Sequence, residues 1–183
     1  MYISKGLEIR LPGAPLTCIL IEELISLGVQ EIIFLGIAGS IQSDIAIRNR
    51  VIVTEAIRLE GTSYHYLPPE KSAIASSQMR KDFEEFLTSQ GVSFHIGKVC
   101  SIDAPFRETF TLIETLQKQN ALAIEMEVSA VLSVGLFREI KSVALLVISD
   151  QLIEEHWTGI KSKEIIKTYK ESLEQCYDFF IRK

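Results

Sequence analysis

Short apolar runs alternate with amphipathic segments along this chain, and this alternation limits the folds that it can adopt. The runs have the length of strands and are continuously apolar, as in residues 143–148. Strands of this kind are buried on both faces, which requires helices on both sides of a mostly parallel sheet. We therefore predict an α/β fold in which residues 1–183 form a single domain.

Apolar periodicity and turn residues predict where the elements lie. The expected strands are residues 31–37, 51–58, 94–102, 121–124 and 142–149. The expected helices are residues 15–28, 76–89, 107–119, 128–137 and 163–181. Small residues predict a loop over residues 36–40, and a Pro-Pro pair marks an extended loop over residues 60–72.

The charge balance argues against nucleic acids and membranes as partners. There are 19 Lys and Arg residues against 24 Asp and Glu residues, which gives a net charge of −5. An acidic chain has no overall attraction to DNA, RNA or anionic lipid. The apolar runs are also much shorter than the roughly 20 residues that a membrane helix needs.

The cysteines indicate the redox environment. Cys18, Cys100 and Cys176 lie far apart in the sequence and form no C-x-x-C pair. An odd number of distant cysteines predicts neither a disulfide framework nor a zinc ribbon, and it fits a reducing compartment. Residues 1–10 also lack the apolar run of a signal peptide. We therefore expect a cytoplasmic protein without a metal site.

Acidic side chains follow three of the expected strands, at the sheet edge where α/β proteins bind ligands. They are Asp103, Glu125 with Glu127, and Asp150. Buried carboxylates are costly unless they are paired, so packing alone does not explain them. A carboxylate can accept two hydrogen bonds from a ribose diol, and a carboxylic acid can protonate a purine nitrogen as the base leaves. The pattern predicts a site for a hydroxyl-rich ligand.

Each of these residues also has a structural explanation. Asp103 can cap the helix that follows it, and Asp150 can cap a turn. One of Glu125 and Glu127 can be an exposed charge at a helix start. Gly39 can simply allow a tight turn. Only the joint placement of these residues favours a ligand site.

Six short motifs follow one another in a recognisable order. They are Gly13-Ala14-Pro15 ahead of Glu22-Glu23-Leu24, GIAGSI at 36–41, EGTSYHYLPP at 60–69, SIDAPFRET at 101–109, IEMEVSA at 124–130 and VISDQL at 147–152. In this order they resemble the purine-nucleoside and uridine phosphorylase superfamily, and above all its uridine-phosphorylase-like microbial members. The resemblance runs from about Gly13 to the C-terminus.

The resemblance implies a three-layer α/β fold whose central sheet is mixed, partly barrel-like and flanked by helices. It implies a pentosyltransferase of nucleoside metabolism and nucleotide salvage, which cleaves a nucleoside with phosphate into a free base and ribose 1-phosphate. No cofactor is implied beyond phosphate as co-substrate. The partners implied are a small-molecule nucleoside or base and further copies of the chain, in a dimer or hexamer.

Position by position, the resemblance also implies site residues. Glu125, Met126 and Glu127 match the Glu-Met-Glu segment that binds ribose, where Glu127 would accept the sugar hydroxyls and Met126 would pack on the sugar. Asp150 matches the aspartate of purine-type members that assists protonation of the base, and it is our candidate catalytic residue.

Further candidates lie on the base side. Phe106 stands beside the family's base-stacking position, and Arg107 and Glu108 are placed to contact base edges. Gly39 belongs to the glycine motif and is expected to lie against substrate. Trp157 either covers the base or is an ordinary packing residue.

The sequence departs from the family pattern where phosphate binds. Phe34 stands where phosphorylases usually have arginine, and Ile37 replaces the usual Ser or Thr. Neither side chain offers the charge or the donors that bind phosphate. We also expect the chain to lack the family's N-terminal strand–loop–helix, which contacts phosphate. The alternatives are therefore a non-catalytic nucleoside-binding homologue with a lost phosphate subsite, or a nucleosidase that uses water.

Overall fold

A computed structural model describes residues 13–153, 156–159 and 162–182. The helices are α1 (Ala14–Ser26), α2 (Ser77–Ser89), α3 (Phe110–Lys118), α4 (Val128–Phe137) and α5 (Ser162–Arg182). The strands are β1 (Glu31–Ser40), β2 (Arg50–Leu59), β3 (Ala73–Ile74), β4 (His95–Ile102), β5 (Ala121–Glu125), β6 (Lys141–Ile153) and β7 (His156–Thr158). Two short 3-10 helices, η1 (Thr62–His65) and η2 (Pro105–Arg107), lie in loops.

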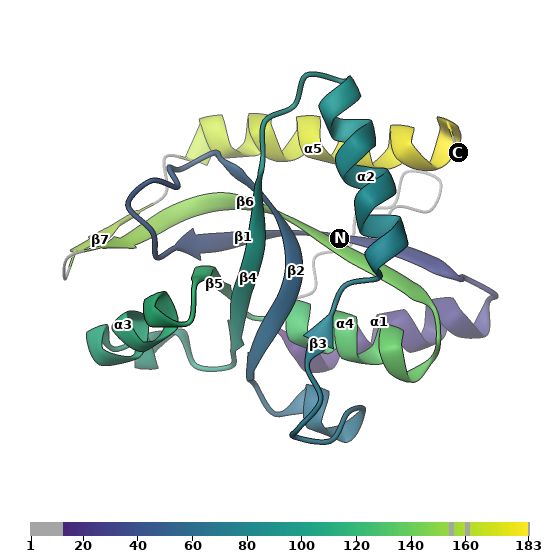
Figure 1. The fold of residues 1–183 in the computed structure, drawn as a ribbon, viewed down its shortest axis with the longest axis horizontal. Helices are drawn as coiled ribbons and strands as arrows, with labels where there is room; N and C mark the ends of the chain where they lie inside the picture. Colours follow the sequence, from purple (N-terminus) through teal and green to yellow (C-terminus); the bar gives the residue numbers. More distant parts are fainter. Residues whose placement is uncertain (1–12, 154–155, 160–161, 183) are drawn as a thin grey trace.

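The expected three-layer α/β architecture is confirmed. Helices α2 and α5 lie on one side of the sheet, and α1, α3 and α4 lie on the other (Figure 1). Each side has its own apolar core, because continuously apolar strands present buried side chains to both helical layers. Among the described helices, none combines the length and the apolar character needed to span a bilayer.

The sheet is mixed and partly closed, as the family resemblance implied. Its strand order is β3-β2-β4-β5-β1-β6-β7, and β2 also pairs with β6, so that β2, β4, β5, β1 and β6 form a ring. Within the ring, three strand pairs (β1–β6, β2–β4 and β4–β5) are parallel and two (β1–β5 and β2–β6) are antiparallel, so the expectation of a mostly parallel sheet is confirmed there. One parallel group (β1 and β6) meets another (β2, β4 and β5) along two antiparallel seams. Closing the ring in this way leaves fewer strand edges unpaired.

Strand β1 is longer than predicted, because residues 36–40 are part of it instead of forming a loop. The glycines there serve close packing. A Cβ at Gly36 would lie 2.7 Å from Cε1 of Phe34, and one at Gly39 would lie 2.8 Å from Cδ1 of Leu152. The motif therefore has glycine at these positions because neighbouring side chains leave no room for a Cβ, and not because the chain turns there.

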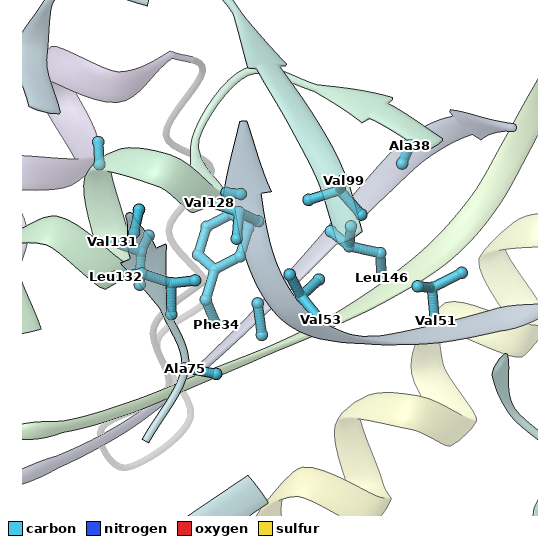
Figure 2. Close-up of a cluster of buried hydrophobic side chains, with 14 of the residues drawn as sticks. Phe34, Ala38, Val51, Val53, Ala75, Val99, Val128, Val131, Leu132 and Leu146 are labelled. Carbon is cyan, nitrogen blue, oxygen red and sulfur yellow. The ribbon is translucent and has the colours of Figure 1, made fainter. Parts of the chain in front are cut away.

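Phe34 lies inside the core between the sheet and α4. Only 9% of its surface is exposed, and Figure 2 shows its ring near Val128, Val131 and Leu132 of α4 and Val53 of β2. A buried aromatic ring of this size contributes strongly to stability. Position 34 is therefore a core position in this chain.

The loop after β2 is held by a buried arginine. The guanidinium of Arg58 donates hydrogen bonds to the hydroxyl of Ser63 and to the carbonyls of Leu67, Pro68 and Lys71 at 2.7–2.9 Å. It also lies 4.1 Å from the ring centroid of Tyr64. The planar fork of arginine suits such multiple bonding, which a lysine cannot reproduce.

Replacing Arg58 by lysine should therefore destabilise the fold. The variant leaves buried carbonyls without donors, so we expect the free energy of unfolding in urea to fall by about 2 kcal/mol. The matched control is Arg182→Lys on the surface of α5, where the guanidinium forms an exposed ion pair with Asp178 and lies 5.9 Å from the ring centroid of Phe86. That variant should change stability by less than about 0.5 kcal/mol. Equal effects of the two variants would contradict the role given to Arg58.

Candidate functional site

A bulge between β1 and β6 brings Gly39 and Asp150 together. The strands pair residue by residue up to Ala38 and Ile148, and Gly39 then pairs with Asp150 because Ser149 is an extra residue. Bulges of this kind redirect side chains next to functional sites. A Cβ at Gly39 would lie 3.0 Å from Oδ2 of Asp150, so glycine makes room for this carboxylate.

Both oxygens of Asp150 accept hydrogen bonds. The hydroxyl of Ser149 donates to Oδ1 at 2.6 Å, and the indole Nε1 of Trp157 donates to Oδ2 at 2.9 Å. Sequence reasoning did not predict these two partners. Ser149 adjoins Asp150, but no Gly, Pro or Asn between residues 152 and 157 signals the hairpin that returns Trp157.

Glu125 is buried at the start of α4. Its Oε2 accepts from the backbone N–H groups of Glu127 at 2.6 Å and Val128 at 2.7 Å, and its Oε1 accepts from the hydroxyl of Ser101. Only 5% of its surface is exposed. The structure thus places Glu125 at the helix start as a buried residue and not as an exposed charge, and its contact with ribose stays a prediction.

Burial raises the pKa of the Glu125 carboxyl to about 8. Desolvation outweighs the three hydrogen bonds that it accepts, and the neighbouring Glu127 carboxylate raises the pKa further. Near neutral pH the protonated form of this residue is therefore substantially populated.

Glu127 lies at the N-terminus of a second helix. Its Oε1 accepts a hydrogen bond of 2.5 Å from the backbone N–H of Gly13, just before α1. The side chain is half-buried, like that of Met126, and burial raises its pKa. Helix N-termini favour negative charge, so α1 holds this carboxylate in place. Its predicted contact with sugar hydroxyls is not tested by this arrangement.

The segments that carry the candidate carboxylates flank the end of β1. Gly39 has Ile124 of β5 as its partner on one side and Asp150 of β6 on the other. The Glu-Met-Glu segment directly follows Ile124, so it lies on one flank of β1 while Asp150 lies on the other. The end of β1 thus separates the Glu-Met-Glu segment from Asp150 by one strand.

Of the candidates for contacts with the base, only some lie near the carboxylates at the end of β1. Phe106 is fully exposed and Arg107 is exposed, so the structure does not bring either into contact with the carboxylates. Glu108 is half-buried, and burial together with the charge of Asp150 raises its pKa to about 7. Of the residues in this loop, Glu108 is the one whose pKa the charge of Asp150 raises. Its roughly neutral pKa distinguishes it from an ordinary surface carboxylate.

Asp103 does not cap α3, contrary to its structural explanation. Its Oδ2 accepts from the backbone N–H of Gly61 at 2.9 Å, which ties the loop after β4 to the loop after β2. The cap of α3 is Thr109, whose hydroxyl accepts from the N–H of Leu112 at 3.3 Å.

The two positions that depart from the family pattern offer no anion site. Phe34 is buried, whereas Ile37 is 48% exposed. A groove of about 280 Å³ beside Phe34 is lined by side chains of α1, β1 and α5, with Glu31 as the only charged residue among those that the structure describes. The described residues also contain no group of three His, Cys, Asp or Glu side chains that could hold a metal ion.

The mixed, partly closed sheet flanked by helices agrees with the phosphorylase-type α/β fold, and the comparisons identify the family. The family model of the phosphorylase superfamily matches residues 5–182, so the chain belongs to that superfamily and the resemblance seen in the motifs is confirmed.

Named relatives are nucleoside phosphorylases of modest identity. A guanosine phosphorylase of Halorubrum lacusprofundi is 26% identical over 165 residues, which are 90% of this chain and 68% of the relative. A uridine phosphorylase of Thermococcus kodakarensis is 40% identical over 92 residues, 50% of this chain and 33% of the relative. A DeoD-type purine nucleoside phosphorylase of Clostridium novyi is 29% identical over 154 residues, 83% of this chain and 66% of the relative. This chain thus spans between a third and about two thirds of their length.

Two substitutions of Glu125 should show how much its hydrogen bonds, as distinct from its charge, contribute to stability. Glu125→Ala leaves the N–H groups of Glu127 and Val128 without an acceptor, and we expect the free energy of unfolding to fall by about 2 kcal/mol or more. Glu125→Gln keeps an acceptor oxygen and serves as the matched control. Urea denaturation measures both variants, and equal losses would contradict the capping role.

The stability difference between wild type and Glu125→Gln should depend on pH. The folded pKa of Glu125 is about 8 against an ordinary value of 4.5, so the folded state keeps a proton that the unfolded state releases between these values. The stability that this proton provides is complete below about pH 4.5 and is lost as the pH rises through about 8. Wild type should therefore lose stability relative to Glu125→Gln across this range, and a constant difference would contradict the raised pKa.

Proposed function

We propose that this chain carries out the nucleoside phosphorylase reaction, in which phosphate cleaves the N-glycosidic bond to give a base and ribose 1-phosphate. The observation that carries the proposal is the bulge that sets Asp150 beside Gly39, across β1 from the Glu-Met-Glu segment. The relatives' names support the reaction class, since they include guanosine, uridine and purine nucleoside phosphorylases.

In this proposal, residues on one flank of β1 bind the sugar and a residue on the other flank acts on the base. Glu127 and Met126 hold the sugar on one flank. Asp150 on the other flank protonates the base as the glycosidic bond breaks and the bonding electrons move to the base nitrogen. The carboxylates near the sugar also stabilise the positive charge that develops on it.

Phosphate needs ligands other than the residues at positions 34 and 37. Phe34 is a core residue and Ile37 is apolar, so neither can bind an anion. We propose that a neighbouring copy in a homo-oligomer contributes to this subsite. Exposed apolar side chains on α1 and at the end of α4, such as Ile19 (56% exposed) and Phe137 (51% exposed), support such an assembly.

A nucleoside panel tests the reaction. Release of base from guanosine, inosine, adenosine and uridine, followed by chromatography with and without phosphate, should depend on phosphate. Asp150→Asn should lower kcat by about a hundredfold or more, which is typical for the loss of a general acid. The matched control Asp178→Asn changes an exposed carboxylate on α5 and should keep full activity.

Two results would overturn this proposal. Release that is equally fast without phosphate would identify a nucleosidase. Binding of a nucleoside in calorimetry without release under either condition would identify a non-catalytic homologue.

The pKa of Glu108 gives the reaction a predicted pH profile. We propose that Glu108 shares a proton with Asp150, and the pKa of Glu108, raised to about 7, means that its protonated form is lost as the pH rises through that value. The kcat/KM of wild type should therefore fall above about pH 7. Glu108→Gln cannot release a proton, so its activity should be low and flat across this range.

The control for this profile is Glu114→Gln, on the exposed side of α3. It should retain the wild-type profile between pH 5.5 and about 9, a range chosen to bracket the raised value. A Glu108→Gln variant with the same profile as wild type would contradict the shared proton.

A further inference from the structure

The strand β7 returns along β6 and carries the chain's single tryptophan back to Asp150. In this antiparallel pair Trp157 is the partner of Leu152, two residues beyond Asp150. The composition contains only one Trp, so every tryptophan signal of the protein comes from this position.

The ring of Trp157 is held although it is 64% exposed. Its Nε1 donates to Oδ2 of Asp150 at 2.9 Å. On the other side, a Cβ at Gly159 would lie only 2.3 Å from Cη2 of the ring, so glycine lets the backbone pass close to the indole. An exposed ring fixed by a hydrogen bond and a glycine contact differs from a ring buried for packing.

The hydrogen bond from Trp157 to Asp150 fixes the orientation of the Asp150 carboxyl group. Oδ1 accepts from the hydroxyl of Ser149 at 2.6 Å and Oδ2 accepts from the indole at 2.9 Å, and the second lone pair of Oδ2 is the one that we assign to a ligand. The indole N–H is a donor only, so it fixes this oxygen without competing for a proton. Bonds from donors on both sides hold the plane of the carboxyl group.

We propose that Trp157 is a positioning residue for Asp150, whose indole N–H orients Oδ2 toward the base of a bound nucleoside. This inference rests on the proposed function, and it adds a specific residue to it. Trp157 acts through Asp150 and need not touch the base itself. Its effect is therefore expected on the rate of bond cleavage rather than on binding.

Fluorescence tests the contact independently of activity. In Asp150→Ala the indole loses its acceptor, so we expect the Trp157 emission to shift and its quenching by acrylamide to increase relative to wild type. Thr158→Ala, in the same strand, is the matched control and should leave both signals unchanged. Identical emission and quenching in wild type and Asp150→Ala would overturn the inference.

Kinetics tests the consequence. Trp157→Phe keeps the aromatic body and removes the N–H, so kcat should fall about tenfold, as expected for one hydrogen bond to a charged group, while KM changes little. Trp157→His restores a ring N–H and should recover part of the rate. In the Asp150→Asn background Trp157→Phe should have no further effect, because the two residues act as one unit.

The outcomes distinguish this inference from the proposed function. If wild type releases no base, the proposed function fails and the catalytic role of Trp157 fails with it, whereas a fluorescence change in Asp150→Ala would still establish the contact. If wild type is active and Trp157→Phe keeps full kcat, or lowers it equally in both backgrounds, the positioning role is overturned while the proposed function stands.

Discussion

The pairing of β1 with β6 is the constraint on which the rest of the structure depends. Ten positions of β1 are in register with β6, with one bulge near the end. The regular part sets Phe34 beside Ala144 inside the core, and the bulge sets Gly39 beside Asp150. One strand pair therefore supplies both the centre of the fold and the centre of the candidate site, and β5 completes the site by crossing the end of β1.

Buried carboxylates secure the elements around this pair. Glu125 accepts from the first N–H groups of α4, Glu127 from Gly13 at α1, and Glu60 from Thr62 and Ser63 at η1. Each satisfies backbone donors that a helix end leaves unpaired. Ser129 of α4 links Glu60 to Glu125, because its hydroxyl donates to Glu60 and its N–H donates to the hydroxyl of Ser101, which donates to Glu125.

The sequence predicted most of the elements but less of the site. The bounds of α4 were predicted because an uncharged, mostly apolar run begins and ends there, and buried helices give such runs. The end of β1 was taken for a loop because Gly36 and Gly39 suggest a turn, although their role is to admit Phe34 and Asp150. The hydrogen bond of Trp157 and the effect of Asp150 on the pKa of Glu108 depend on how β7 and the loop after β4 fold back on the sheet, which no local pattern encodes.

The most direct test of the central claim is to follow the sugar product by ³¹P NMR in a mixture of the protein, nucleoside and phosphate. The account predicts that the phosphate signal declines while a ribose 1-phosphate signal grows in equal amount to the released base. Released base with an unchanged phosphate signal, or no change in either, would contradict it.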